Sequence, residues 1–243
     1  MEIENTKRFV FLPHGILDGF GGMLVETEAL KMEIEITHLA INEYLYALLP
    51  ERDPVLQEME ALAKERQIPI IGPVVGRILY QLVRLVKAKR VFELGSAIGY
   101  STLWIARAAG EGSEVCYTDS DPGNARQAER FLERAGVRDR IKILSGDALE
   151  MLDQTPGTFD VIFNDVNKEN YPLVFHKALP RLRKGGLLLA DNVLWSGRIT
   201  QSPQDQDAAT RGIVEFNRLI YTCKELFPTI LPVRDGFAVC EKL

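Results

Sequence analysis

One stretch near the middle of the chain constrains its fold more than any other. Residues 90–101 read Arg-Val-Phe-Glu-Leu-Gly-Ser-Ala-Ile-Gly-Tyr-Ser, an apolar run that ends in an acid and two glycines and continues into an amphipathic segment. This order is typical of a strand, a tight turn and a helix. In open α/β sheets, ligands bind where such turns follow the carboxyl ends of strands. Gly95 and Gly99 let the backbone approach a ligand closely, and the helix start offers free N–H groups.

Two acids indicate which kind of ligand would bind there. Glu93, at the end of the first strand, disfavours a pyrophosphate and suits a ligand with hydroxyls and a positive centre. The glycine spacing G-x-x-x-G also differs from the G-x-G-x-x-G of dinucleotide folds. A second short strand, 115–119, ends in Asp119, where a ribose diol is usually held. These features indicate an adenosine-type cofactor, although many strand-to-helix turns carry two glycines for packing alone.

Length and composition limit the remaining classes. A chain of 243 residues with 46% hydrophobic and 26% charged residues is typical of one large globular domain or of a domain with an extension. The net charge of −5 argues against a nucleic-acid surface. No apolar run approaches a membrane span, and the N-terminus lacks a signal-peptide pattern. Cys116, Cys223 and Cys240 form no metal or redox spacing and fit a reducing cytoplasm. We therefore expect a cytoplasmic protein without a membrane partner.

The chain divides into two parts. Residues 1–43 are interpreted as an N-terminal extension, which serves as a flexible arm, a lid or a subunit contact; the residues themselves do not choose among these. Apolar residues recur at helical spacing within 26–49, after Asp53-Pro54 and from Val75 to Val86, and these patterns predict three helices ahead of the sheet.

Beyond residue 90, expected strands and helices alternate, which is typical of a parallel sheet with right-handed crossovers. Near the C-terminus, Asp235-Gly236 joins two β-favouring runs and predicts a hairpin. The pattern therefore predicts five parallel strands followed by an antiparallel pair. The expected strands lie near 91–95, 114–119, 141–145, 159–164 and 187–191, and the expected helices near 100–109, 121–135, 147–153, 170–183 and 205–225.

Polar residues lie at the carboxyl ends of the fourth and fifth expected strands. Asp165 follows one strand, and Asp191 and Asn192 follow the other. If the strands are neighbours, two carboxylates and an amide oxygen converge. A site of oxygen ligands suits Mg²⁺, Mn²⁺ or Ca²⁺ rather than Zn²⁺. The alternative is that these residues cap the segments that follow, where Asp and Asn are common.

Three further residues have two interpretations each. Lys168, three residues past Asp165, is either a proton acceptor beside a cation or a surface lysine at a helix start. Trp195 either forms the wall of a pocket or belongs to the core. Asp147, after the third strand, either meets an adenine edge or caps the short helix that follows.

Several motifs, in this order, resemble a known family: the cation-dependent, S-adenosylmethionine-dependent O-methyltransferases, which comprise the caffeoyl-CoA and catechol O-methyltransferases and their bacterial relatives. The resemblance runs from about residue 44 to the C-terminus. The motifs are Glu93-Leu94-Gly95 with Gly99-Tyr100-Ser101, Asp119, Gly146-Asp147-Ala148, Asp165-x-x-Lys168-x-x-Tyr171, Asp191 to Gly197, and Arg234-Asp235-Gly236.

The resemblance implies a fold and an activity. The fold is an α/β, Rossmann-like, seven-stranded class I methyltransferase sheet over residues 44–243. It is mostly parallel, with an antiparallel last strand and helices on both faces. The activity is methyl transfer from S-adenosylmethionine to a hydroxyl of a small catechol-like or phenolic acceptor. A divalent cation assists it, with Mg²⁺ favoured and Mn²⁺ or Ca²⁺ as alternatives. Relatives are commonly homodimers, so we expect one here.

The resemblance also implies site residues by position. Metal ligands are Asp165, Asp191 and Asn192, and Lys168 is catalytic together with Asp165. Asn167 departs from the family, because many members carry a second aspartate there. The implied cofactor contacts are Ile71, Glu93, Gly95, Ser101, Asp119, Asp147, Ala148 and Asp165, and Trp195 is expected in the acceptor pocket.

Three rival functions differ in what they require. A methyltransferase acting on a hydroxylated RNA base needs a basic face, which the sequence lacks, unless the N-terminal arm guides the RNA instead. A non-catalytic S-adenosylmethionine-binding protein has no use for Asp165, Lys168 and Asp191. An NAD-type oxidoreductase is disfavoured by the missing third glycine and by Glu93.

Overall fold

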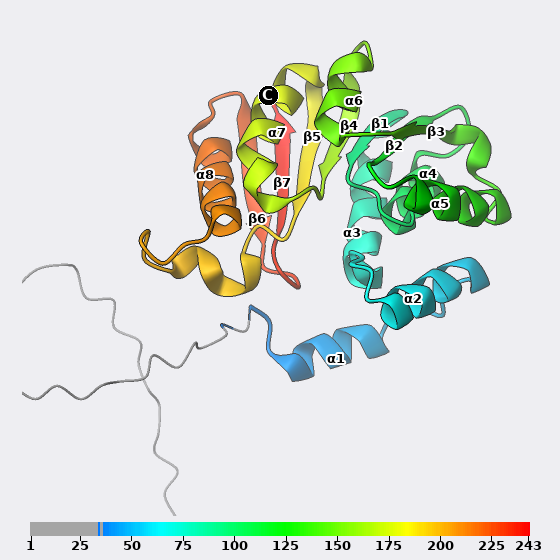
Figure 1. Cartoon of the computed structure of the whole chain (residues 1–243), viewed down its shortest axis with the longest axis horizontal. Helices are drawn as coiled ribbons and strands as arrows, with labels where there is room; N and C mark the ends of the chain where they lie inside the picture. The colour runs from blue at the N-terminus through cyan, green and yellow to red at the C-terminus, as the bar shows by residue number, and fades with distance from the viewer. Residues whose placement is uncertain (1–33, 35) are drawn as a thin grey trace, which may run out of the picture. The chain divides into compact units, whose positions relative to one another are not determined.

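The computed structural model describes residues 34 and 36–243 (Figure 1). Most of the predicted N-terminal extension, residues 1–43, lies outside the described residues, as does the first part of the helix expected within 26–49. The extension therefore stays a prediction. Within the described residues, no helix is both long enough and apolar enough to cross a bilayer.

A seven-stranded sheet forms the centre of the described chain, in the order β3-β2-β1-β4-β5-β7-β6. The first five strands are parallel, and β7 runs antiparallel between β5 and β6. This confirms the predicted sheet with its antiparallel last strand. The strands are β1 (Arg90–Leu94), β2 (Glu114–Asp119), β3 (Ile141–Ser145), β4 (Phe159–Asn164), β5 (Leu182–Asp191), β6 (Leu226–Leu231) and β7 (Phe237–Lys242).

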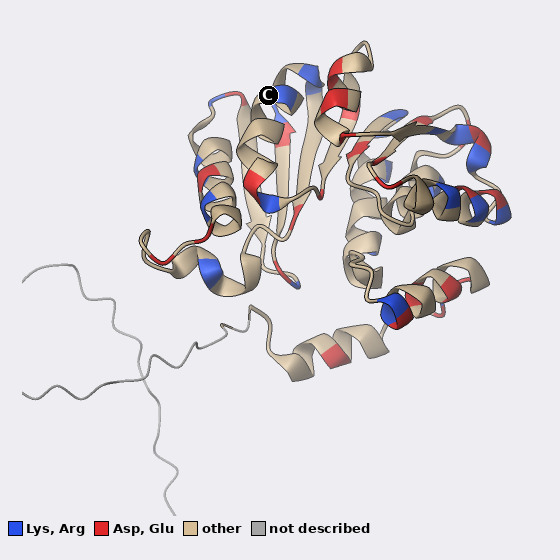
Figure 2. Ribbon diagram, in the orientation of Figure 1, with Lys and Arg blue, Asp and Glu red and all other residues tan. Residues whose placement is uncertain are grey.

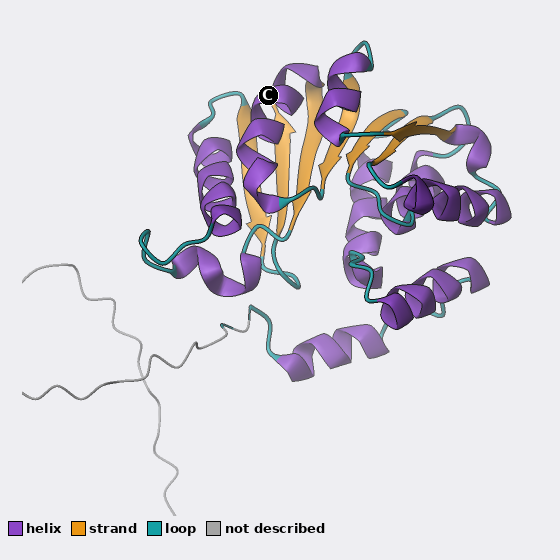
Figure 3. Cartoon of the chain, viewed as in Figure 1, coloured by secondary structure: helices purple, strands orange, loops and turns teal. Residues whose placement is uncertain are grey.

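Helices cover both faces of the sheet (Figure 3). Because side chains alternate along a strand, Val91 and Val115 pack with α2–α5, whereas Phe92 and Cys116 pack with α6–α8. The helices are α1 (Leu39–Ala47), α2 (Pro54–Arg66), α3 (Gly72–Leu85), α4 (Tyr100–Ala109), α5 (Pro122–Arg134), α6 (Ala148–Gln154), α7 (Tyr171–Ala178) and α8 (Ala208–Thr222).

The ends of several helices follow from local residues. Asp53 and Asp121 accept hydrogen bonds from the first turns of α2 and α5, and each is followed by a proline, as the sequence predicts. The fifth strand is longer than expected. β5 begins at Leu182 rather than at 187, because its register against β4 shifts between Phe159 and Val161.

The order of the strands decides which side chains meet. β1 lies between β2 and β4, and β5 lies beside β4. The carboxyl ends of these parallel strands therefore share one edge of the sheet. The turn after β1, Asp119 at the end of β2, Asp165 just past β4 and Asp191 at the end of β5 are thereby brought to the same edge.

Candidate active site

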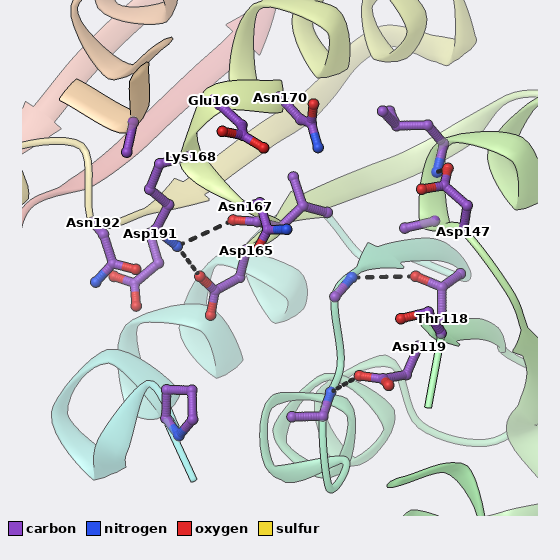
Figure 4. A pocket seen from close by; sticks show the side chains of 18 of the residues that line it. Thr118, Asp119, Asp147, Asp165, Asn167, Lys168, Glu169, Asn170, Asp191 and Asn192 are labelled. Atoms are coloured by element: carbon purple, nitrogen blue, oxygen red, sulfur yellow. Dashed lines mark hydrogen bonds and ion pairs between the residues drawn. The ribbon is translucent and has the colours of Figure 1, made fainter. Parts of the chain in front are cut away.

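A cavity of about 760 Å³ opens at this edge of the sheet (Figure 4). Its walls come from the turn after β1, the ends of β2 and β5, the segments after β3 and β4, and the linker before α3. In Figure 4, Thr118, Asp119 and Asp147 lie together on one side, and Asp165, Lys168, Asp191 and Asn192 lie together on the other. The site is thus divided into two chemically different halves.

The turn after β1 passes close to the second half. Gly95 has φ +83°, and a Cβ added there would lie 2.7 Å from the backbone oxygen of Asp165. The amide of Asp165 donates a 2.9 Å hydrogen bond to the carbonyl of Leu94. Only glycine adopts this conformation at this distance without strain, so Gly95 fixes how closely the two halves approach each other.

Asp119 presents a carboxylate that the protein already orients. Its Oδ2 accepts a hydrogen bond of 3.0 Å from the amide of Ala97, and its Oδ1 accepts bonds of 2.8 Å from the amide of Asp121 and 3.2 Å from Asn124 Nδ2. The neighbouring Thr118 Oγ1 accepts from the amide of Gly95 at 3.2 Å. A carboxylate held in this way is suited to accept hydrogen bonds from ligand hydroxyls.

Asp147 caps α6, one of the two roles that the sequence leaves open, and its contact with an adenine stays a prediction. Its Oδ1 accepts hydrogen bonds of 2.9 and 3.0 Å from the amides of Leu149 and Glu150 and so caps α6. It also lines the cavity, together with Ala148. The cap fixes the direction of the side chain at the cavity wall.

Three predicted cofactor residues lie outside the cavity lining: Ile71, Glu93 and Ser101 are all buried. Glu93 is fully buried beneath the turn, where Thr102 Oγ1 donates a hydrogen bond to it, while its Oε1 has no partner among the described residues. Burial raises the pKa of Glu93 to about 7. Direct contact of these three side chains with a ligand stays a prediction.

Two carboxylates dominate the other half. Asp165 leaves 24% of its side chain exposed, and its Oδ1 is 2.7 Å from Lys168 Nζ. Asp191 is 3% exposed, and its Oδ1 has no partner among the described residues. Burial raises the pKa of both carboxyls. For Asp165 the nearby Lys168 opposes the rise, whereas for Asp191 the charge of Asp165 adds to it and brings the pKa to about 7. Crowding of acids in a partly dry site is costly unless a positive charge compensates it.

The donor set fits a hard divalent cation. Asn192, with φ +57°, follows Asp191 and lines the same cavity. It offers an amide oxygen beside two carboxylates, and Asp191 Oδ1 lacks a partner in the described chain. Oxygen donors of this kind suit Mg²⁺, Mn²⁺ or Ca²⁺. The part of the chain that the structure describes holds no group of three or more His, Cys, Asp or Glu residues able to share a metal ion, so the third protein ligand would have to be the amide.

Two aromatic rings border Lys168. Its Nζ lies 5.9 Å from the ring centre of Trp195 and 5.3 Å from that of Tyr171. Trp195 lines the cavity and also packs against the core cluster that contains α7 and α8, so both interpretations of this residue apply. Tyr171 is buried, and its hydroxyl donates a 2.8 Å hydrogen bond to the carbonyl of Asp191, which links α7 to the end of β5.

Sequence reasoning assigned no role to several residues of the wall. Arg234, in the turn between β6 and β7, lines the cavity, as do Pro69, Ile70 and Thr118. Thr118 was detectable from its place at the end of β2. Arg234 belongs to one of the motifs quoted above, but its contact was not detectable, because only the fold brings a hairpin turn to the linker before α3.

Comparison with known proteins places the chain in a family. The family model described as O-methyltransferase matches residues 50–243. A catechol O-methyltransferase of Niastella koreensis is 32% identical over 82% of this chain and 95% of its own length. A caffeoyl-CoA O-methyltransferase of Eucalyptus gunnii is 31% identical over 86% of this chain and 92% of its own.

A solved structure agrees with these relatives. The O-methyltransferase of Bacillus cereus, determined in complex with SAH (S-adenosylhomocysteine), superposes with a TM-score of 0.77 at 30% identity, covering 84% of this chain and 97% of that one. The fold, the arrangement of the strand ends and the sequence matches lead to one assignment. The chain belongs to the O-methyltransferase family of class I S-adenosylmethionine-dependent enzymes.

Proposed function

We propose that this enzyme transfers a methyl group from S-adenosylmethionine to one hydroxyl of a catechol-like or other small phenolic acceptor, with the help of a divalent cation. One observation carries the proposal: a single cavity joins the turn after β1 and Asp119 to the pair Asp165 and Asp191. The names of the relatives, catechol and caffeoyl-CoA O-methyltransferase, support the acceptor class. The SAH in the Bacillus cereus structure supports the cofactor.

In this proposal the cofactor occupies the half that contains Asp119 and Asp147. Asp119 accepts hydrogen bonds from the ribose hydroxyls, and the wall at Asp147 and Ala148 receives the adenine. Gly95 allows the amino-acid end of the cofactor to lie against the backbone. The sulfonium then points toward Asp165, because the turn at Gly95 approaches that residue.

Asp165, Asp191 and Asn192 would hold the cation. When bound there, it supplies Lewis acidity that lowers the pKa of an acceptor hydroxyl and fixes the direction of that hydroxyl. The raised pKa values of the two carboxyls show that ionising both is unfavourable in this buried site. A bound positive charge would make their ionised forms more favourable. Lys168 holds the side chain of Asp165, and the hydrogen bond from Tyr171 fixes the backbone that carries Asp191.

Lys168, in its uncharged amine form, accepts the proton of the acceptor hydroxyl and becomes the ammonium that pairs with Asp165. Its Nζ lies at the cavity wall between Asp165 and the ring of Trp195, within reach of an acceptor hydroxyl. The resulting phenolate oxygen attacks the methyl carbon, and the electrons of the breaking carbon–sulfur bond stay on sulfur. Holding oxygen, carbon and sulfur in line is a proximity effect worth at most about 7–11 kcal/mol. Trp195 would stack on the acceptor ring and exclude water.

The decisive assay measures methyl transfer from labelled S-adenosylmethionine to a vicinal diphenol and to the matching monophenol, each with and without EDTA. We expect faster methylation of the diphenol, on one hydroxyl, and loss of that activity with EDTA. Full activity in EDTA would reject the cation. Transfer to RNA but to no phenol would favour the rival acceptor. The charges of α5 and α8 speak against that result, because Lys and Arg alternate there with Asp and Glu and form no basic face (Figure 2).

We further propose that the protein is a cytoplasmic homodimer. Its cysteines Cys116, Cys223 and Cys240 are all unpaired, which suits a reducing compartment. The α1 helix, with the sequence LAINEYLYA, buries none of its residues although most of them are apolar. Ile41, which is 53% exposed, and Leu48, which is 61% exposed, lie two turns apart on one face. A second copy of the chain would cover such a face.

A further inference from the structure

The turn between β6 and β7 contacts the cavity wall through one side chain. Arg234 Nη1 donates a 3.2 Å hydrogen bond to the carbonyl of Ile70 and a second bond to the carbonyl of Ile71. Pro69 and Ile70 line the cavity, as Arg234 itself does. The guanidinium therefore ties the C-terminal hairpin to the linker before α3, a segment about two thirds of the chain away.

The backbone on both sides is shaped for this contact. Arg234 has φ +50° and Gly72 has φ +67°. A Cβ added at Gly72 would lie 3.4 Å from Arg234 Nη1 and 3.1 Å from the hydroxyl of Tyr46. A left-handed conformation is unfavourable for arginine and persists only where the surroundings impose it. The strained backbone and the glycine both serve the approach of the guanidinium to the linker.

The same turn also holds the loop after β5. The amides of Val193 and Leu194 donate hydrogen bonds of 3.1 and 2.9 Å to the carbonyls of Gly236 and Asp235, and the amide of Ser196 donates to Asp235 Oδ1. This loop carries Asn192 and Trp195. The turn is thus bonded to two separate walls of one cavity.

We propose that Arg234 is a positioning residue, which holds the linker Gln67–Ile71 closed over the cavity and couples it to the loop that carries Asn192 and Trp195. The inference rests on the proposed function, because the linker borders the cavity that would hold S-adenosylmethionine. Both bonds come from Nη1, and arginine suits this partly buried contact because a planar guanidinium is less strongly hydrated than the compact ammonium of lysine. Among residues 36–243, the hydrogen bonds between the hairpin and this linker come from Arg234.

The test compares Arg234→Gln and Arg234→Lys with the control Arg218→Gln, whose parent side chain pairs with Glu215 on the exposed face of α8. Loss of two charge-assisted bonds predicts an affinity for S-adenosylmethionine about tenfold weaker in both Arg234 variants, measured by calorimetry without acceptor. Hydrogen exchange of the peptide over residues 67–72 should become faster in both. The control should match the parent in both measurements.

Each contrary result has a distinct meaning. If the parent protein binds no S-adenosylmethionine, the proposed function fails. If the parent binds it and Arg234→Gln binds it equally, with unchanged exchange at 67–72, the positioning role fails. Full recovery in Arg234→Lys would also overturn the role. It would mean that residue 234 acts through its positive charge on Asp165 and Asp191 and not through its hydrogen bonds to the linker. A weaker affinity only for carboxylate-bearing acceptors, with unchanged cofactor binding, would instead make Arg234 an acceptor contact.

Discussion

Lys168 Nζ lies 2.7 Å from Asp165 Oδ1, so the proposed proton acceptor and a proposed metal ligand form an ion pair within three residues of each other. The Lys168 side chain is only 11% exposed. In such a site, removal of one partner of an ion pair leaves the other charge buried and unbalanced, which costs more than the same change on the surface. The two residues therefore affect each other, and variants of each need separate readouts.

Replacing Asp165 by Asn should separate catalysis from cofactor binding. We expect methyl transfer to a diphenol to fall by at least about 100-fold, because a carboxylate is lost from the proposed cation site. Affinity for S-adenosylmethionine, measured by calorimetry, should stay within about threefold. The matched control is Asp139→Asn, at a side chain that is 78% exposed. Wild-type rates in the Asp165 variant would contradict the metal role.

Replacing Lys168 by Met should lower the turnover of a diphenol by about 10²–10⁴-fold, the usual loss when a general base is removed. The deficit should shrink toward high pH, where the acceptor hydroxyl ionises without help. Rates measured across pH 6–10 check this. A loss that stays constant across that range would show that Lys168 only orders Asp165.

Glu93 should make the stability of the protein depend on pH. Its pKa is raised from 4.5 to about 7 by burial. Between these values the folded state binds more protons than the unfolded one, so the free energy of unfolding falls as pH rises. The loss is at most about 3 kcal/mol and is complete above pH 7. Glu93→Gln removes this term and should gain stability over the parent at pH 8.

Urea denaturation of both proteins at pH 5 and pH 8 tests this expectation. The difference between variant and parent isolates Glu93, since all other groups titrate in both. A difference that is the same at the two pH values would mean that Glu93 is ionised in the folded protein below pH 5.

Gly95→Ala should be more harmful than Gly112→Ala. Both glycines have positive φ, but a Cβ at Gly112 meets nothing within 4 Å, whereas at Gly95 it would lie 2.7 Å from Asp165 O. The control carries only the left-handed strain of about 1–2 kcal/mol. Gly95→Ala adds a backbone clash of about 1–3 kcal/mol and should also weaken cofactor binding. Chemical denaturation and calorimetry measure both effects, and equal losses would contradict the close approach.

Charge introduced on α1 should dissociate the proposed dimer. Ile41→Glu with Leu48→Glu places two carboxylates on the exposed apolar face of the helix. Light scattering after size exclusion should give about twice 27.3 kDa for the parent and a single chain for the variant. A parent that is monomeric at micromolar concentration would reject the dimer.

Much of the fold was predictable because the relevant rules are local. The alternation of strands and helices, the caps at Asp53 and Asp121 and the turn at Asp235-Gly236 all depend on neighbouring residues. The strand-end rule then brings Asp119, Asp165 and Asp191 to one edge without any knowledge of side-chain packing.

The rest depends on contacts between distant segments. Glu93 ends up beneath the cavity because it shares the face of β1 with Val91 and meets Thr102 of α4. The place of Arg234 depends on how a hairpin turn meets the linker at Ile70. The early start of β5 depends on a register shift against β4. Glu93 and Arg234 occur in motifs of the sequence, but those motifs do not say which distant residues they contact.

Asp119 has a consequence for how a ligand is received. Three donors from the protein, the amides of Ala97 and Asp121 and the side chain of Asn124, already fix its carboxylate. An incoming sugar would find an acceptor that needs no rearrangement and would lose little rotational entropy in meeting it. The half of the site at Asp119 would then be preorganised for its ligand, and any adjustment to different acceptors would take place in the half at Asp165 and Asp191.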